Sequence, residues 1–219
     1  MLNLKLLLAF IHIVNIPKFM RALLVAIFFL LFPSLSAESA REAEGYFNTN
    51  RQDDGRYLVE FKGMKFEVRS YFPAKPKFSN QSAYHILKDP LMQFFLIVSK
   101  HQSVTADHMM RMVLADIGHQ YRGLDLQVVN VKKSDLEETE SDGLKRIFQQ
   151  FVLDLSNGFR EFVTVNLYRN SEYDVTTLTR FTLSPTEKED LDYRMKGNDM
   201  TKKFHDETQV KIPPEVTPK

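Results

Sequence analysis

The chain has 219 residues and a formal net charge of +1, with 29 lysines and arginines against 28 acidic residues. This length is typical of a single domain with tails, and the even charge without a basic patch argues against a nucleic-acid partner. There is no cysteine, which excludes disulfides, thiolate zinc sites and a cysteine nucleophile. An oxidising compartment is not excluded, because a domain of this size buries an adequate core without crosslinks.

Residues 1–37 have the pattern of a signal peptide. Two apolar runs, 6–16 and 22–32, are separated by a proline and a lysine, and small residues ending at Ala37 follow the second run. This pattern predicts cleavage after Ala37, with Met20 as an alternative start. The other interpretation is an uncleaved inner-membrane anchor, although each run is shorter than the roughly 20 residues of a membrane helix. We expect a periplasmic or secreted protein.

Beyond the leader, composition predicts an arm, one domain and a tail. Residues 38–55 are polar and rich in turn formers, which indicates a linker or a loosely docked arm. Residues 56–206 carry strand-like and helix-like apolar patterns and are expected to form one domain. Residues 207–219 contain three prolines and are expected to be disordered.

The domain is expected to begin with a hairpin and a long loop. In residues 56–72, a turn at 62–63 places Val59 opposite Phe66 and sorts the apolar side chains to one face. Residues 73–90 contain three prolines and predict an irregular connection, and long loops of this kind are often functional.

A buried strand and an amphipathic helix follow. Residues 93–99 form a largely apolar run, which predicts a central strand covered on both faces. Residues 105–123 predict a helix with Thr105 or Ser103 as the N-cap and Gly123 at its end. Its core-facing stripe, spaced by three and four residues, consists of Met110, Val113, Leu114, Ile117 and Tyr121.

The stretch after the helix combines a strand and an acidic segment. Residues 124–132 alternate in a way that predicts a strand. Residues 134–142 are rich in carboxylates and predict a solvated loop. This loop has neither the spacing nor the central glycine of a calcium-binding EF-hand, so no calcium site is predicted.

Residues 143–184 carry the strongest pattern in the chain, three long strand-like runs. Asn157-Gly158 marks the first hairpin turn. A two-residue turn would place Asp154 opposite Glu161, two like charges. A three-residue turn with Gly158 in the left-handed conformation avoids this, and we predict that turn.

The three-residue turn predicts which side chains share a face. It pairs Phe151 with Val163 and Ile147 with Leu167, which gives one mostly apolar face. The next turn, expected at residues 169–171, pairs Val165 with Val175. The same apolar face would therefore continue into the third strand. The predicted buried face consists of Ile147, Phe151, Val163, Val165, Val175, Phe181 and Leu183.

A final helix is predicted from Ser184. Ser184 and Glu187 have the spacing of a capping box, with a proline at the first helical position. The helix is expected to end at Lys196, because Gly197 follows, with a further turn or two in residues 198–206 pinned by Met200 and Phe204. Its apolar face is thin, which is typical of a helix on the surface.

These elements predict an α+β fold, a twisted antiparallel β-sheet (a meander) with helices packed on it, like an α/β/α sandwich. The phrase YLVEFKGMKFEVRSYFP, the run FFLIVSK and the capped helix TADHMMRMVLADIG resemble the PsbP-like family. The resemblance covers residues 57–203. It implies an α/β/α sandwich and a non-enzymatic accessory or assembly protein, like the extrinsic photosystem and bacterial envelope members of that family.

No motif in the sequence predicts catalysis or metal binding. The six histidines form no HxxxH or HExxH pair, and no nucleophile elbow, phosphate-binding loop or GxGxxG motif occurs. Glu161 is a carboxylate on the predicted apolar face. Since it lies near the turn, we expect it to reach water, and the alternative is a functional acid with a raised pKa.

We therefore predict a non-enzymatic binding or accessory protein without a cofactor, acting on an envelope or secreted protein partner. Membrane contact is expected only through an uncleaved N-terminal segment. The candidate binding residues, taken from the 73–90 connection and a methionine-rich flank of the helix, are Phe78, Tyr84, His85, Met109 and Met112. The alternatives are a cystatin- or NTF-like domain that holds a small apolar ligand, and a hydrolase with a site near Glu161 or His119.

Overall fold

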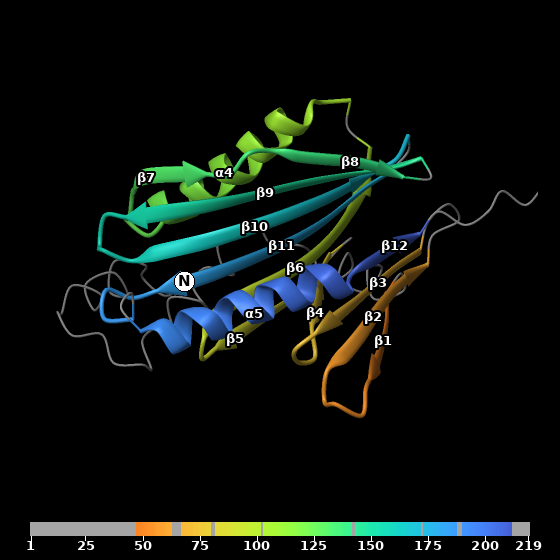
Figure 1. The fold of residues 1–219 in the computed structure, drawn as a ribbon, viewed down its shortest axis with the longest axis horizontal. Helices are drawn as coiled ribbons and strands as arrows, with labels where there is room; N and C mark the ends of the chain where they lie inside the picture. The colour runs from red at the N-terminus through yellow and green to blue at the C-terminus, as the bar shows by residue number, and fades with distance from the viewer. Residues whose placement is uncertain are drawn as a thin grey trace, which may run out of the picture. The chain divides into compact units, whose positions relative to one another are not determined.

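Strands dominate the part of the chain that the structure describes. The structure is a computed structural model and describes residues 47–211 apart from 63–66, 80–81, 102, 142, 172 and 188–189. Of the described residues, 54% lie in strands and 22% in two helices. The predicted fold class is therefore wrong: the chain is a β-rich fold with two antiparallel sheets rather than an α+β, α/β/α sandwich (Figure 1). The predicted leader lies outside the described residues.

The smaller sheet has four antiparallel strands in the order β1-β2-β3-β12. The strands are β1 (Phe47–Arg51), β2 (Tyr57–Lys62), β3 (Glu67–Phe72) and β12 (Gln209–Lys211). β1 comes from the stretch expected as an arm, and β12 comes from the expected tail. Both ends of the described chain therefore contribute a strand to this sheet.

The larger sheet has eight antiparallel strands in the order β4-β5-β6-β11-β10-β9-β7, and β8 also pairs with β9. The strands are β4 (Lys77–Ser79), β5 (Ser82–Lys88), β6 (Leu91–Lys100), β7 (Val128–Lys133), β8 (Glu137–Ser141), β9 (Leu144–Leu155), β10 (Arg160–Arg169) and β11 (Tyr173–Leu183). β7 and β8 follow one another along the same edge of β9, where β8 pairs with residues 144–148.

Two segments that the sequence predicts to be irregular form strands of this sheet. Residues 73–90 contain the edge strand β4 and its neighbour β5, and the acidic segment 134–142 contains β8 at the other edge. Strand pairing uses backbone groups that every residue except proline carries, so an edge strand needs no apolar alternation. Charged side chains on an edge strand also oppose pairing with other chains, which explains why β8 is both acidic and ordered.

The hairpin of β9 and β10 has the predicted register. Phe151 lies opposite Val163 and Ile147 lies opposite Leu167. Gly158 has a φ of 84°, and its N–H donates to the Leu155 carbonyl at 2.9 Å. The three-residue turn is confirmed, because glycine takes this left-handed conformation without a steric penalty.

The predicted register between β10 and β11 is wrong by three residues. Val165 lies opposite Leu178 rather than Val175, because the turn is longer than expected and closes between Arg169 and Asp174. An odd shift turns every side chain to the other face. Both faces of β11 are covered, so the pattern of apolar residues in its sequence does not show which side chains point to which face. The predicted members of the buried face that lie on the opposite face are Val175, Phe181 and Leu183.

The predicted register of the first hairpin is also wrong. Val59 lies opposite Ser70 rather than Phe66, a shift of four residues. An even shift keeps each side chain on its face, and Val59 is fully buried as expected. The predicted turn at Lys62-Gly63 extends into residues outside the described part.

Helix α4 (Ala106–Arg122) confirms the first predicted helix. Thr105 is the N-cap, and its hydroxyl accepts from the His108 N–H at 3.3 Å. Gly123 is the C-cap. The predicted stripe faces the sheet, with Met110, Ile117 and Tyr121 buried and Val113 and Leu114 partly buried.

Helix α5 (Leu191–Glu207) begins and ends later than predicted. The Ser184 N–H donates to the Glu187 carboxylate at 3.0 Å, as in a capping box, but this turn precedes the helix. Gly197 lies inside the helix, where an added Cβ would come within 2.4 Å of the Phe181 ring. The glycine therefore permits close packing rather than ending the helix.

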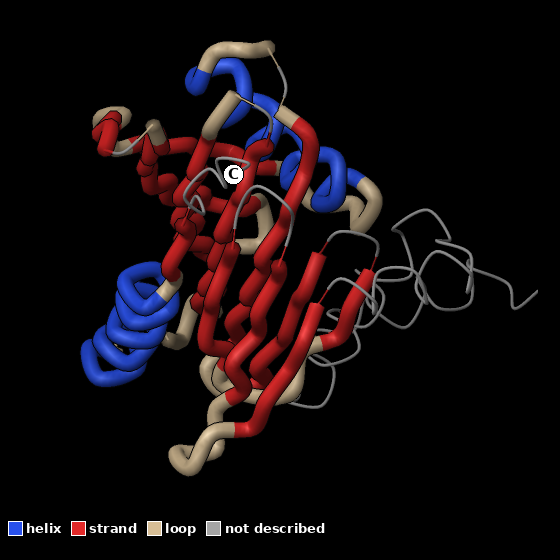
Figure 2. Tube along the Cα trace, turned by 90° about the vertical axis from the view of Figure 1, so that its right-hand side faces the viewer, coloured by secondary structure: helices blue, strands red, loops and turns tan. Residues whose placement is uncertain are grey.

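The two helices lie on opposite faces of the larger sheet (Figures 1 and 2). We call the face with Ile147 and Val163, beneath α4, the α4 face, and the other the α5 face. On the α5 face, the Phe204 ring meets Phe72 of the smaller sheet and Phe94 of the larger one, each at 5.2 Å between centroids. Helix α5 therefore joins the two sheets through a shared core.

Candidate ligand-binding groove

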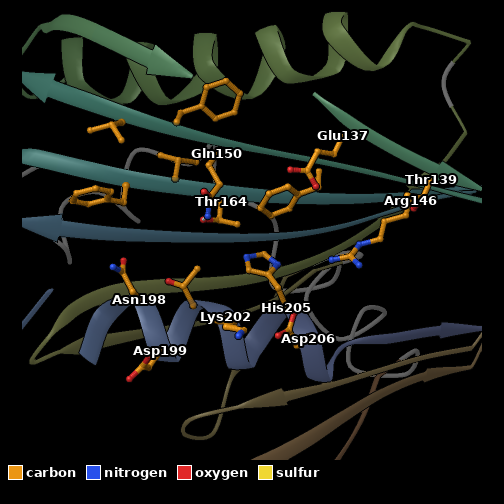
Figure 3. Close-up of a pocket in the computed structure, with 16 residues that line it drawn as sticks. Glu137, Thr139, Arg146, Gln150, Thr164, Asn198, Asp199, Lys202, His205 and Asp206 are labelled. Atoms are coloured by element: carbon orange, nitrogen blue, oxygen red, sulfur yellow. The ribbon is translucent and has the colours of Figure 1, made fainter. Parts of the chain in front are cut away.

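A groove of about 630 Å³ lies on the α5 face, between α5 and strands β8, β9 and β10 (Figure 3). Helix α5 packs mainly on β11 and β3, where Gly197 allows it to approach the Phe181 ring closely. Because α5 packs over β11 and β3, it leaves part of β9 and β10 uncovered. The groove is thus a direct result of where the helix is anchored.

The floor of the groove carries half-buried apolar side chains. Phe148 and Val152 of β9 and Phe162 of β10 line it, and Phe162 stacks on Phe181 at 6.0 Å. Alternate residues of a strand share a face, so the row from Arg146 to Val152 extends over about 20 Å. The floor is therefore elongated, with an arginine at one end and the polar pair Gln150 and Thr164 between Phe148 and Val152.

The Arg146 guanidinium projects into the groove at this end (Figure 3). Its Nε donates to Asn166 Oδ1 at 3.1 Å, and its guanidinium carbon lies 5.9 Å from the centre of the Tyr168 ring. Among the described residues, no carboxylate forms an ion pair with Arg146. Asn166 is fully buried, and its Nδ2 has no hydrogen-bond partner within the described part of the chain.

His205 of α5 closes the groove beside Arg146. It is 3% exposed, and its two ring nitrogens lie 2.9 Å from the Thr177 hydroxyl and 3.1 Å from the Thr179 hydroxyl. Burial, together with the nearby Arg146 charge, lowers the pKa of His205 to about 3. The ring is therefore neutral at physiological pH and serves as a structural contact between α5 and β11.

The rim of the groove carries both positive and negative side chains. Helix α5 contributes Lys202, Asp199 and Asp206, and β8 contributes Glu137, all of them exposed. Together with Arg146, the lining has two cations and three carboxylates. A ligand here meets a largely apolar floor, a mixed rim and, at one end, the Arg146 guanidinium with its terminal nitrogens unused among the described residues.

The α4 face, by contrast, carries a closed polar network. Glu161 is fully buried, accepts from Arg180 Nε at 2.5 Å and accepts from the Tyr121 hydroxyl at 2.8 Å. Arg180 also donates to Gln120 Oε1 at 2.9 Å. Burial and the Glu161 carboxylate raise the pKa of Tyr121, which keeps its hydroxyl protonated. The expectation that Glu161 reaches water is wrong, because α4 covers it and Arg180 neutralises it.

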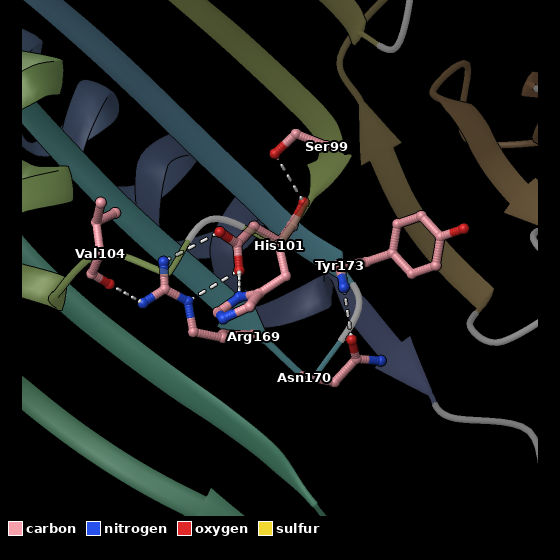
Figure 4. A network of polar contacts seen from close by, with 7 residues as sticks. Ser99, His101, Val104, Arg169, Asn170 and Tyr173 are labelled. Carbon is pink, nitrogen blue, oxygen red and sulfur yellow. Dashed lines mark hydrogen bonds and ion pairs between the residues drawn. The ribbon is translucent and has the colours of Figure 1, made fainter.

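A second buried acid, Asp174, holds the start of α4 in place (Figure 4). Arg169 donates to both carboxylate oxygens of Asp174, at 2.9 and 3.0 Å, and to the Val104 carbonyl at 2.6 Å. His101 Nδ1 lies 3.1 Å from the same carboxylate. Ser99 reaches the backbone carbonyl of Asp174 rather than the histidine. This arrangement fastens the loop before α4 and gives no nucleophile–base contact.

The candidate binding residues predicted from the sequence lie in two separate places. Phe78 of β4 is half-buried and stacks on Phe47 at 5.5 Å, and Tyr84 stacks on Phe95 at 6.3 Å. His85 Nδ1 lies 3.2 Å from the Lys75 carbonyl, and burial lowers its pKa.

The two methionines lie on α4, on the other side of the fold. Met109 packs partly buried against the core beneath the helix, and Met112 is 42% exposed. Phe78 belongs to the core that contains Phe204. The structure therefore does not bring the five candidate residues together, and none of them lines the groove.

The groove residues were missed because they come from separate strands and a helix whose bounds were wrong. One signal was available: Asn166 interrupts the apolar run FVTVNLYR in the middle of a long strand. A polar residue at such a position needs a partner when it is buried. Within the described ranges, no group of three or more histidines and carboxylates could hold a metal, and no helix is long and apolar enough to cross a membrane.

Comparison with known proteins leaves the family of this chain open. No protein-family model matches it, and no curated protein matches it significantly. The resemblance to the PsbP-like family therefore stays a prediction.

Proposed function

We propose that this protein is a non-enzymatic binding protein that holds a small organic ligand in the groove beneath α5. The observation that carries this proposal is the groove itself, with its apolar floor and converging polar groups. Small-molecule sites commonly have volumes of about 300–1,000 Å³ and this kind of lining. This corresponds to the ligand-binding alternative of the sequence interpretation, though with a more polar rim.

The polar groups of the groove support binding rather than catalysis. A general base works best when its pKa lies near the working pH, whereas the pKa of His205 is about 3 and both ring nitrogens face threonine hydroxyls. Arg146 and Lys202 are cations that can hold a ligand but are poor proton acceptors. No step of a reaction is therefore assigned to these residues.

Action on a protein partner, in the periplasm or outside the cell, stays a prediction. Of the five residues named for it, Met112 is exposed and the other four are half-buried. A partner surface built on Phe78 and Tyr84 would need to displace rings that already stack within the fold. The groove needs no such rearrangement, which favours a small ligand.

Native mass spectrometry of the full chain, purified from its own host without detergent, tests the proposal. Thr201→Trp places an indole in the groove, because Thr201 lines it from α5. Lys203→Trp is the matched control, because Lys203 is exposed on the same helix and lies outside the lining. We expect one bound mass in the parent protein and in Lys203→Trp, and its loss in Thr201→Trp. No bound mass in the parent, or equal retention in Thr201→Trp, would contradict the proposal.

A further inference from the structure

The Arg146 guanidinium lies in the groove without an acidic partner among the described residues. Arg146 uses its Nε on Asn166, and its terminal nitrogens form no hydrogen bond or ion pair within the described residues. Asn166 is fully buried, and its Nδ2 is unpaired within the described part of the chain. A guanidinium carries donors only, so the terminal nitrogens of Arg146 are open to an acceptor that a ligand brings.

The chemistry of the pair determines which atom of Asn166 is the free one. A guanidinium has donors only, so the amide oxygen must face Arg146 and the amide nitrogen must point elsewhere. Asn166 shares its face of β10 with Thr164 and Phe162, which line the groove, and it lies opposite Phe148. Asn166 itself does not line the groove, and its buried Nδ2 is out of reach of a ligand there. Its role is to hold the Arg146 guanidinium in place through Nε.

The two terminal nitrogens of the guanidinium match the two oxygens of a carboxylate. Exposed carboxylates also line the groove, on Asp199, Asp206 and Glu137, with Lys202 as the second cation. They make the site unfavourable for a dianion, because each added negative charge meets repulsion across the groove. A single negative charge is the best match to this lining.

The rest of the ligand must suit the apolar row that begins at Arg146. Phe148 follows Arg146 on the same face of β9, and Val152 and Phe162 extend the apolar surface along the groove. We infer that the groove binds an amphiphilic monocarboxylate, with its carboxylate on the Arg146 guanidinium and its apolar chain along Phe148, Val152 and Phe162. This inference rests on the proposed function and names its ligand class.

Isothermal titration calorimetry with three probes that share one chain tests the inference: decanoate, decanol and decyl phosphate, at neutral pH and below micelle formation. We expect decanoate to bind about 10-fold or more tightly than decanol, since a hydrogen bond to a charged group contributes about 1.5–3 kcal/mol. Arg146→Gln should remove most of that difference and leave decanol binding unchanged. Asp206→Asn should tighten decanoate binding by a few-fold.

Two further variants separate the site from general effects of charge and folding. Arg194→Gln removes the same charge from an exposed position of α5 outside the lining, so decanoate should bind it as it binds the parent protein. Asn166→Asp keeps the shape but places a carboxylate against Arg146 Nε, which neutralises the guanidinium, and it should weaken decanoate at least 10-fold. If this variant fails to fold, Arg146→Gln alone decides, because Arg146 is only half-buried.

The outcomes distinguish the inference from the proposed function. Equal binding of decanoate and decanol, both abolished by Thr201→Trp, would overturn the monocarboxylate and leave a groove that binds apolar ligands. Tighter binding of decyl phosphate than of decanoate would overturn the preference for a single charge. Binding of none of the probes would overturn the inference and, together with the absence of a retained mass, the proposed function.

Discussion

Arg180 and Arg146 lie on opposite faces of the larger sheet and are held in opposite ways. Arg180 is 2% exposed and bonded to Glu161, Tyr121 and Gln120 beneath α4. Arg146 is half-buried in the groove beside α5, and within the described residues its only hydrogen bond is to Asn166. A buried cation is tolerated when its partners neutralise it, whereas a cation left without a counter-charge in a groove costs stability and favours a ligand. The polar groups of the α4 face are thus paired within the fold, whereas the α5 face leaves a cation without a counter-charge among the described residues, as the proposed ligand-binding role requires.

The largest loss of stability is expected when a partner is removed from the buried ion pair beneath α4. Glu161→Gln leaves Arg180 buried without a counter-charge, and breaking such a pair costs about 3–5 kcal/mol. Urea unfolding at neutral pH measures the loss. Glu138→Gln is the control, because its ion pair with Lys145 is more than one-third exposed on both sides, and such pairs contribute less than about 1 kcal/mol. Equal losses in the two variants would remove the contrast between the faces.

The anchoring of α5 is tested by adding a single methyl group. Gly197→Ala places a Cβ within 2.4 Å of the Phe181 ring, and overpacking of this kind costs about 1–3 kcal/mol. Gly118→Ala in α4 is the matched control, because its Cβ would meet only the flexible end of Arg122, at 3.7 Å. It should stabilise the protein by about 0.5–1 kcal/mol through helix propensity. A neutral Gly197→Ala would show that α5 has room to move over the groove.

The buried histidine beneath α5 predicts a dependence of stability on pH. Burial and Arg146 lower the pKa of His205 from 6.5 to about 3 in the folded state. Between these values the unfolded chain binds the extra proton, so stability falls as the pH drops through this window, by at most about 1.4 kcal/mol per pH unit. His205→Gln keeps a polar side chain and removes the titration. Unfolding free energies at pH 7 and pH 5 should differ less in this variant than in the parent protein, and an unchanged difference would contradict the assignment.

The smallest change in the free energy of unfolding is expected at Arg146, and it is best judged against the same substitution at Arg180. Arg146→Gln removes a guanidinium that has no acidic partner in the described part of the chain, so the free energy of unfolding should fall by no more than about 1 kcal/mol, the contribution of its hydrogen bond to Asn166. Arg180→Gln, measured by the same urea unfolding, should cost several kcal/mol, because it strands the fully buried Glu161 carboxylate. A large loss in Arg146→Gln would mean that this arginine stabilises the fold rather than a ligand.

Local chemistry explains which elements could be predicted. The cap at Thr105, the left-handed Gly158 and the pairing of β9 with β10 depend on residues close together in sequence, and all three are as predicted. The apolar stripe of α4 could also be predicted, because a helix buried on one side repeats its apolar residues every three to four positions.

The candidate site was not predictable in the same way. Its residues come from β8, β9, β10 and α5, and the last of these was expected to stop at Gly197. Only the contact with the Phe181 ring shows that this glycine belongs inside the helix. Asn166 was visible as a polar residue in an apolar strand, but its partner Arg146 lies 20 residues earlier in the chain.

The sequence by itself determined the strongly patterned elements, because turn residues, caps and apolar periodicity act within a few residues of one another. Only tertiary contacts determine which face each side chain of β11 points to, which segments pair as edge strands and where α5 ends. β11 is covered on both faces, edge strands pair through their backbones, and α5 continues because a glycine lets it touch a ring. The groove exists where that helix stops covering the sheet, which no local pattern records.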